Sequence, residues 1–336
     1  MKLFTRLSVI LLFACLLSGS MFAGDEDMKV EHKVGGTVQS WVSYQAADSA
    51  FLGFGLRRVR ARWYATINSK FKTMVQAELT DPKLLDARLE YHFSKQFNVR
   101  MGRFVGAGVR GGGLTSHSQI DIVERPRVAN YWAARTIGSD FRDYGVQAEA
   151  KSATGEYAGR VFFHNGSGAA NVISHERTSP REAQLRGIAA DVMVIAAPKS
   201  VEGLEVGGHF GVGNKDVKEW TSYSGYAYYE PGPFRLKAEL VGLVDKSGAE
   251  DVTTMGYYVF GGFEVTPNIE IVGRFETFDP NTDVDEDGVN DITAGFVYKQ
   301  FSGKVNHKLT AAIVIPSEQG ESVKNTAFYT VWQIVF

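Results

Sequence analysis

The sequence predicts an all-β fold, namely a transmembrane antiparallel up-and-down β-barrel of about sixteen strands. Three observations predict it. Apolar and polar residues alternate with a period of two along most of the chain, which is the period of a strand. Short and long connections between these segments take turns. The chain ends on the strand-like stretch NTAFYTVWQIVF, whose last residue is Phe336.

The first 23 residues have the pattern of a secretory signal peptide. Lys2 and Arg6 precede an apolar run from Leu7 to Leu17, and small residues ending at Ala23 follow. This order is typical of a leader that is removed after export. Residues 1–23 are therefore predicted to be a signal peptide and residues 24–336 the barrel domain. A lipoprotein signal acylated at Cys15 is the alternative, but the apolar run continues past that cysteine.

Composition excludes several classes of protein. Cys15 is the only cysteine, so the mature chain has neither a disulfide framework nor a thiolate metal site. Without Lys2 and Arg6, 34 of the 36 basic residues face 38 acidic ones, a net charge of −4 that gives no reason to expect nucleic acid as a partner. Beyond the leader no apolar run approaches the roughly 18 residues of a membrane helix. Any membrane-spanning part must be made of strands.

The alternating segments divide into an apolar and a polar face. Two segments, near residues 34–44 and 183–195, separate the two kinds of residue poorly, so their registers stay open. The expected outward residues are Phe71, Thr73, Val75, Ala77 and Leu79, then Leu85, Ala87, Leu89, Tyr91 and Phe93, then Phe234, Leu236, Ala238 and Leu240, and in the last strand Phe328, Thr330, Trp332, Ile334 and Phe336.

The connections point to an even number of strands with both chain ends on the side of the short turns. This is the arrangement of bacterial outer-membrane barrels. The short connections are residues 68–70, 94–96, 152–156, 198–203, 230–233, 266–268 and 302–303, and the long ones are 47–53, 80–83, 105–142, 165–182, 214–220, 245–253, 279–291 and 316–323.

A lipid environment explains both the closure and the aromatic residues. A strand in lipid must pair every backbone N–H and C=O, which only a closed barrel achieves. Tryptophan and tyrosine gather near segment ends, as an interfacial girdle would place them; an aromatic core of a soluble secreted β-sheet binding protein is the alternative. These residues are Trp41, Tyr44, Trp63, Tyr64, Tyr226, Tyr228, Tyr229, Tyr257, Tyr258, Tyr298 and Trp332.

Basic residues mark the polar face of the first strands. In RRVRARWYATI, Arg58, Arg60 and Arg62 lie opposite the apolar stripe and are expected to line the lumen. Rings of Arg and Lys favour anions in a pore. Acidic residues share this wall, so the charges would alternatively neutralise one another around a wide aqueous channel. The other expected lumen residues are Lys72, Arg88, Arg100, Glu78, Asp86 and Glu90.

The longest connection carries a family resemblance. The strand containing MGRF leads into SQIDIVERPRVANYWAARTIGSDFRDYGVQAEAK, and this stretch, FETFDPNTDV and the last strand resemble the phosphate-selective porin O and P family. The resemblance implies a sixteen-stranded trimeric porin of the bacterial outer membrane. It also implies that the loop folds inward and narrows the lumen. The charged candidates for this constriction are Arg110, Asp121, Glu124, Arg125, Arg127 and Arg135. The terminal strand, ending at Phe336, resembles the signal read by the barrel-assembly machinery.

Motifs for other chemistries are weaker. GAGVRG, residues 106–111, is not followed by a helical pattern, so we interpret its glycines as loop flexibility. In residues 279–291, Asp283, Asp285, Asp287 and Asp291 resemble half of a calcium loop, but the twelfth position is Ala294, not Glu. A structural calcium ion and a hydrated acidic loop are equally open alternatives. No other cofactor is expected.

We therefore predict a non-enzymatic outer-membrane porin for passive diffusion of small hydrophilic solutes. Its arginines predict a preference for small anionic solutes, phosphate among them. The resemblance implies a homotrimer in contact with outer-membrane lipid. The alternatives are an outer-membrane barrel enzyme that hydrolyses lipid or peptide, and a soluble secreted β-sheet binding protein.

Overall fold

The computed structural model describes residues 29–46, 50–166, 188–213, 219–302, 305–320, 323 and 325–336. The predicted signal peptide lies outside these ranges. Within them, no helix is both long enough and apolar enough to cross a membrane.

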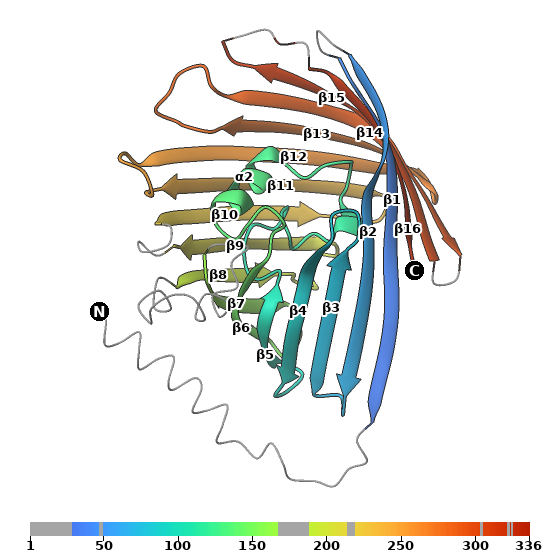
Figure 1. Cartoon of the computed structure of the whole chain (residues 1–336), viewed down its shortest axis with the longest axis vertical. Helices are drawn as coiled ribbons and strands as arrows, with labels where there is room; N and C mark the ends of the chain where they lie inside the picture. The colour runs from blue at the N-terminus through green and yellow to red at the C-terminus, as the bar shows by residue number, and fades with distance from the viewer. Residues whose placement is uncertain are drawn as a thin grey trace.

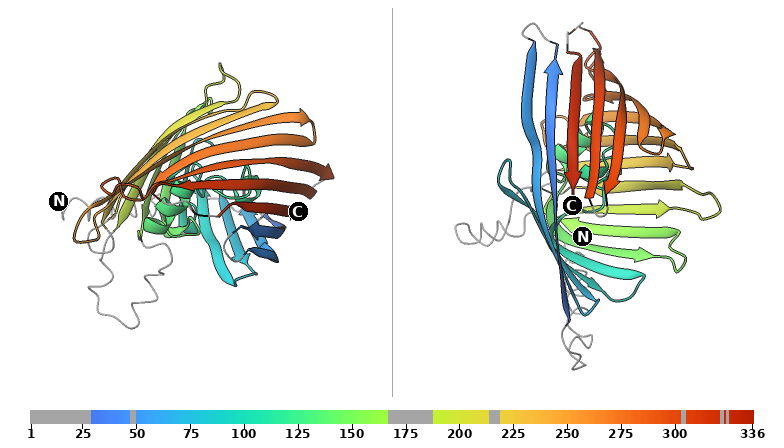
Figure 2. Two further views of the ribbon diagram at one scale, coloured as in Figure 1. Left: turned by 90° about the horizontal axis from the view of Figure 1, so that it is seen from above. Right: turned by 90° about the vertical axis from the view of Figure 1, so that its right-hand side faces the viewer.

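Sixteen antiparallel strands form one closed barrel in which each strand pairs with its neighbours in sequence and β1 pairs with β16 (Figures 1 and 2). The predicted fold class is confirmed. The strands are β1 Val30–Gln45, β2 Phe51–Ile67, β3 Phe71–Glu78, β4 Lys83–His92, β5 Phe97–Phe104, β6 Asp143–Lys151, β7 Tyr157–His164, β8 Ala189–Ala196, β9 Leu204–Val212, β10 Trp220–Tyr229, β11 Phe234–Asp245, β12 Val252–Thr266, β13 Ile269–Asp279, β14 Val289–Ser302, β15 Val305–Glu318 and β16 Ala327–Val335.

The apolar stripe faces outward, as expected. In β11, Phe234 and Leu236 are exposed on the outer surface, while Lys237 and Glu239 are buried on the inner one. Phe336 is also exposed, and its backbone N–H donates to the carbonyl of Gly36 in β1, so the last residue takes part in closing the barrel. Closure gives every strand a partner on both sides, as a sheet in lipid requires, although the ends of the longest strands, such as Phe51–Arg58 of β2, extend beyond the neighbouring strand.

Two β-bulges change which residues face the lumen. Leu85 was expected to point outward, but it is fully buried and Leu84 is exposed in its place. The register passes from Gln76 opposite Asp86 directly to Ala77 opposite Leu84, so Leu85 is an extra residue that reverses the alternation. In β2 the register likewise omits Arg57. The prediction for Leu85 is wrong because period-two spacing cannot anticipate an inserted residue.

Some of the expected girdle aromatics face inward. Tyr226, Tyr228 and Tyr258 are buried, and Trp41 stacks on Tyr329 with ring centroids 5.9 Å apart inside a buried cluster. They pack against the inserted loop rather than meeting lipid headgroups. Aromatics that are exposed on the outer surface are Tyr44, Trp63, Tyr229, Tyr257, Tyr298 and Trp332.

The structure also resolves the two open registers. In β1, Thr37 lies opposite Val335 and is fully buried toward the lumen. In β8, Asp191 lies opposite Gly211 and is likewise buried; residues 183–187 of that predicted segment lie outside the described residues. The connections lie where they were predicted, but their lengths do not alternate strictly: the predicted long connection between β3 and β4, residues 79–82, is no longer than the predicted short one between β4 and β5, residues 93–96.

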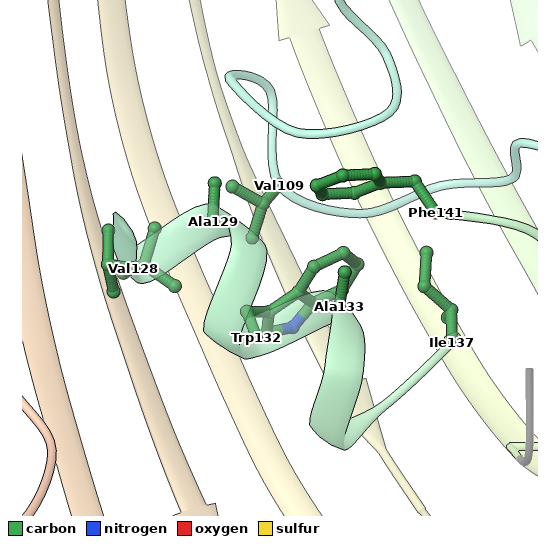
Figure 3. Close-up of a cluster of buried hydrophobic side chains, with 8 residues drawn as sticks. Val109, Val128, Ala129, Trp132, Ala133, Ile137 and Phe141 are labelled. Atoms are coloured by element: carbon green, nitrogen blue, oxygen red, sulfur yellow. The ribbon is translucent and has the colours of Figure 1, made fainter. Parts of the chain in front are cut away.

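The long loop between β5 and β6 folds into the barrel. It contains a 3-10 turn, η1 His117–Gln119, and one helix, α2 Arg127–Arg135, which packs inside the barrel against β11, β12 and β13 (Figure 2). The helix starts after Pro126, and its apolar residues lie on one face. Figure 3 shows Val109, Trp132, Ile137 and Phe141 gathered in the cluster that joins the helix to the wall.

An arginine on the outer surface should destabilise the barrel according to its depth. Val259 lies in the middle of β12 and Val265 near its short-turn end, and both are about half exposed on the outer face. We expect Val259→Arg to lower the free energy of unfolding by about 2–4 kcal/mol and Val265→Arg by at most about 1 kcal/mol. Urea unfolding in lipid vesicles measures both. Equal costs for the two variants would contradict a lipid-facing outer surface.

Candidate functional site

Several cavities lie inside the barrel beside the inserted loop. The largest, cavity 1, has a volume of about 590 Å³ and reaches Asp81 and Lys83 on the long-connection side. Cavity 2, of about 400 Å³, shares Leu114 with it and lies against β11, β13, β14 and β15. A cavity of about 540 Å³ shares Arg110 with cavity 2 and is lined by the short connection at residues 198–203. Neighbouring cavities share lining residues, so together they line the inserted loop from the long-connection side to the short-turn side.

The walls of cavities 1 and 2 carry more positive than negative charge. Eight basic and five acidic side chains line cavity 1, an excess of three positive charges. Five basic and three acidic side chains line cavity 2, an excess of two. The basic residues of cavity 1 are Arg57, Arg58, Arg60, Arg62, Lys83, Arg88, Arg125 and Arg142, and its acidic residues are Glu78, Asp81, Asp86, Glu124 and Asp140.

Three of the predicted arginines form a wall without carboxylate partners. Arg58 donates to the side-chain oxygen of Gln39 at 2.9 Å, and Arg62 donates to the Gly36 carbonyl at 2.9 Å and to Thr37. Arg88 lines the same cavity from β4. Among the described residues no carboxylate lies within salt-bridge distance of these three guanidinium groups. Their charge therefore remains available to a solute. We name Arg58, Arg62 and Arg88 the arginine wall.

Other predicted lumen residues neutralise one another. Arg60 pairs with Glu78 at 2.8 Å, Arg100 with Glu90 at 2.9 Å, and Asp86 with Arg142 of the loop at 2.9 Å. The alternative of mutual neutralisation thus applies to these pairs and not to the arginine wall. Lys72 is exposed near the short-turn end of β3, opposite Glu90 in register, and lines none of the cavities described above.

Most charged residues predicted in the constriction loop instead attach it to the barrel. Arg127 pairs with Asp291 of β14, and Arg135 with Asp245 of β11 at 3.2 Å. These pairs link residues more than a hundred positions apart. The remaining attachments are Arg110 to Glu205 at 2.8 Å, Glu124 to Arg57 at 2.5 Å, and Asp121 to Arg235 and Lys237.

Arg125 is the exception in the loop. It donates to the loop carbonyls of Gly112 at 2.9 Å and Thr115 at 2.5 Å, and its guanidinium lies 4.9 Å from the ring centroid of Phe141. It lines cavity 1 opposite the barrel wall. Arg125 thus holds the loop's own backbone and adds positive charge to the cavity.

Glu239 anchors the glycine-rich start of the loop. Its two carboxylate oxygens accept the backbone N–H groups of Arg110 and Gly111, each at 2.7 Å, and its Oε2 also accepts the Tyr258 hydroxyl at 3.2 Å. A Cβ on Gly111 would lie 2.6 Å from the Tyr258 hydroxyl. The glycine allows a close approach to the wall, so the interpretation as loop flexibility is wrong at this position.

His117 is buried in η1 beside the basic wall, with its Nε2 3.2 Å from the Thr37 hydroxyl. Burial lowers the pKa of His117, and the nearby Arg60, Arg58 and Arg62 lower it further. The ring is therefore neutral in the folded protein at ordinary pH. Protonation would add a charge to a site that is already positive.

Acid should weaken the docking of this loop. The unfolded His117 gains a proton below a pH of about 6.5 while the folded one does not, so stability is present above that pH and falls as the pH is lowered. We expect a loss of at most about 1.4 kcal/mol per pH unit below it. Denaturant unfolding of the wild type and His117→Gln between pH 7 and pH 5 measures the difference. Parallel pH dependences in the two proteins would contradict a neutral His117.

The acidic connection at residues 279–291 does not assemble its predicted ligands. Asp283 and Asp285 are exposed, whereas Asp291 is buried toward the lumen and bound by Arg127. In the described part of the chain, no group of three or more His, Cys, Asp or Glu residues is placed to hold a metal ion. Calcium binding by Asp283, Asp285 and Asp287 stays a prediction.

Several residues that line these cavities were missed in the sequence. Arg57 lines cavity 1 because of the β2 bulge, and no local pattern marks it. Arg235 and Lys237 line cavity 2 and could have been found, since they alternate with the outward apolar residues of β11. Lys308, also in cavity 2, donates to the loop carbonyl of Ile120 at 2.7 Å.

The comparisons with known proteins concern the fold. No protein-family model and no curated protein matches the sequence. Among solved structures, an anion-selective porin from Comamonas acidovorans is similar, with a TM-score of 0.68 at 14% identity over 91% of this chain and 99% of that one. OmpF from Salmonella typhi is similar with a TM-score of 0.65 at 10% identity, over 91% of this chain and 97% of that one. The trimer form of OmpT from Vibrio cholerae has a TM-score of 0.60 at 12% identity, over 91% of this chain and 99% of that one. The chain has the sixteen-stranded fold of these proteins.

Proposed function

We propose that this protein is a porin of the bacterial outer membrane, a water-filled channel through which small hydrophilic solutes diffuse passively with a preference for anions. The observation that carries the proposal is the excess of three positive charges around cavity 1, with the arginine wall free of carboxylate partners. The likeness in fold to porins, one of them anion-selective, supports it.

The proposed mechanism involves no chemical reaction. It depends on the electrostatic field that the charged side chains produce along the lumen. An anion in cavity 1 exchanges part of its hydration for guanidinium N–H groups, and it meets further positive charge in cavity 2. One charge about 7 Å from the ion in a water-like medium contributes roughly 0.6 kcal/mol, or nearly threefold in local ion concentration. Paired residues such as Arg60 and Glu78 contribute little, because their fields cancel.

Reversal potentials in a planar bilayer test the proposal. With potassium chloride at two concentrations, we expect the potential to have the sign of chloride permeation, and the preference to weaken as salt screens the walls. Replacing chloride by phosphate tests the finer proposal that phosphate is a natural solute. A clear preference for potassium would refute the anion preference, and the absence of any conductance would refute the channel.

We further propose a homotrimer in contact with outer-membrane lipid. Strands β3, β5, β7 and β8 have 8 residues each. A tilted strand of that length covers roughly 20 Å of height, less than the apolar band of about 25 Å that lipid requires. Contact with neighbouring copies would cover this low wall. Cross-linking in native membranes tests the assembly, with three-chain products expected.

Two alternatives predict different outcomes. A barrel hydrolase predicts lipid or peptide hydrolysis that one Ser, His or Asp substitution abolishes, together with little conductance. The Ser116 hydroxyl forms a hydrogen bond with Ser118 and not with His117, so these residues do not form a catalytic pair. His164 and its two aspartates are fully buried, so a substrate does not reach them. A soluble binding protein predicts purification without detergent, which the exposed apolar outer face disfavours. Recognition of the strand ending at Phe336 by the barrel-assembly machinery remains part of our proposal.

A further inference from the structure

A fully buried cluster of titratable side chains lies where the inserted loop joins the wall. His164 of β7 contacts two carboxylates, with Nδ1 2.8 Å from Asp143 Oδ2 and Nε2 2.6 Å from Asp191 Oδ2. The other oxygen of Asp191 is 2.6 Å from Nε2 of His209 in β9. All four side chains have 0% exposure. The channel mechanism proposed above does not use any of them.

The hydrogen bonds determine the charge of His164. A neutral imidazole has one N–H and can donate to only one carboxylate, whereas an imidazolium donates from both nitrogens. The two aspartates also accept other donors, since Asp143 Oδ2 accepts the Gly166 N–H at 2.8 Å and Asp191 accepts from His209. Two carboxylates around one ring favour its charged form. The Gly166 N–H also lies 3.2 Å from Nδ1, but its shorter contact is with Asp143 Oδ2 at 2.8 Å, which leaves Nδ1 free to donate to that carboxylate. The arrangement therefore corresponds to a protonated His164.

The start of the loop, its end and its helix α2 all contact this cluster of buried side chains. Asp143 is the first residue after the loop. Phe162 stacks on His164 with centroids 4.6 Å apart, and a Cβ on Gly106 at the loop's start would lie 2.2 Å from the Phe162 ring. Trp132 of α2 meets His209 edge-on at 5.5 Å. The start of the loop, its helix and its end thus all contact this buried cluster.

We propose that the His164 imidazolium is a positioning residue that holds the inserted loop in its docked place. This rests on the proposed function insofar as the loop sets the width of the channel. The titratable groups that face His164 are Asp143 from β6, Asp191 from β8 and, through Asp191, His209 from β9; Phe162 and Trp220 add uncharged rings. Loss of the proton leaves two buried carboxylates around a ring that can donate to only one of them, which loosens the loop.

Hydrogen exchange of the loop amides in the detergent-folded full chain tests the proposal without requiring conduction. At one fixed pH near 7, we expect His164→Gln to lower the protection of residues 106–142 by ~10-fold or more. The double variant His164→Gln with Asp143→Asn removes one charge of each sign and should restore protection. His32→Gln, at an exposed histidine stacked on Trp63, is the matched control and should change nothing.

Two further measurements make the result decisive. In protein with ¹⁵N-labelled histidine, the His164 signals should show both ring nitrogens protonated at pH 7. Wild-type channels should carry a steady current at pH 7 and a fluctuating one at alkaline pH, where the double variant stays steady. A neutral His164 at pH 7, unchanged loop protection in His164→Gln, or no rescue in the double variant would overturn the proposal. Wild-type protein that does not conduct would instead refute the channel, and the exchange data would still decide the role of His164.

Discussion

Replacing Arg58, Arg62 and Arg88 together with glutamate is expected to convert the proposed anion preference into a preference for cations. Each substitution changes the charge of cavity 1 by two, so an excess of three positive charges becomes an excess of three negative ones. Each unit charge at about 7 Å changes the local ion concentration nearly threefold. The ratio of chloride to potassium permeability should therefore change by at least an order of magnitude at low salt. Reversal potentials in a potassium chloride gradient measure this directly, through a change of sign.

The chain offers a matched control for this prediction. Arg60 lies between Arg58 and Arg62 on the same wall, but it pairs with Glu78 at 2.8 Å. The double variant Arg60→Gln with Glu78→Gln therefore removes two charges and leaves the net charge of the cavity unchanged. We expect its reversal potential to match that of the wild type. An equal effect of the control and the triple variant would show that net wall charge does not set the preference.

Truncating Trp132 to alanine should release the inserted loop from the wall. The side chain is almost fully buried between Val109, Ile137 and Phe141 (Figure 3). Removing a buried tryptophan costs about 3–5 kcal/mol, which corresponds to at least a hundredfold increase in the undocked population. The single-channel conductance should rise and its current noise should increase, as recorded in a planar bilayer at fixed salt.

Two variants separate loop packing from general damage. The indole Nε1 of Trp132 is buried without a hydrogen-bond partner, so Trp132→Phe loses packing volume but no hydrogen bond and should stay close to the wild type. Trp63→Ala makes the same truncation on the outer surface, where the side chain is partly exposed. It should leave the conductance unchanged. A loop that stayed docked in Trp132→Ala would mean that its other contacts with the wall position it without the packing of Trp132.

Much of the barrel could be predicted because the alternation of apolar and polar residues depends only on consecutive residues of each strand. A strand with one face in lipid and the other in water must alternate, so the outward stripe of β11, the turns and the terminal strand are written in consecutive residues. The exceptions have physical reasons. The bulges at Leu85 and Arg57 each insert one residue, and the inward tyrosines of β10 and β12 face the loop, not water.

The candidate site was less predictable, because its chemistry depends on pairing across the barrel. Arg60 and Arg62 look alike in sequence, but only Arg60 lies within reach of a carboxylate. Arg127 and Asp291, or Arg110 and Glu205, meet because the loop crosses the lumen. The calcium-like motif illustrates the same limit, since Asp291 faces the lumen and binds the loop.

The sequence by itself therefore determined the strands, their outward faces away from the two bulges and the presence of arginines on the first wall, since side-chain direction follows from period two. Only the tertiary structure decided which of those charges remain free and which residues of the wall contact the loop. The physical reason is that a charge is cancelled or left available by partners within a few ångströms, and closing the barrel around the loop brings those partners from distant parts of the chain.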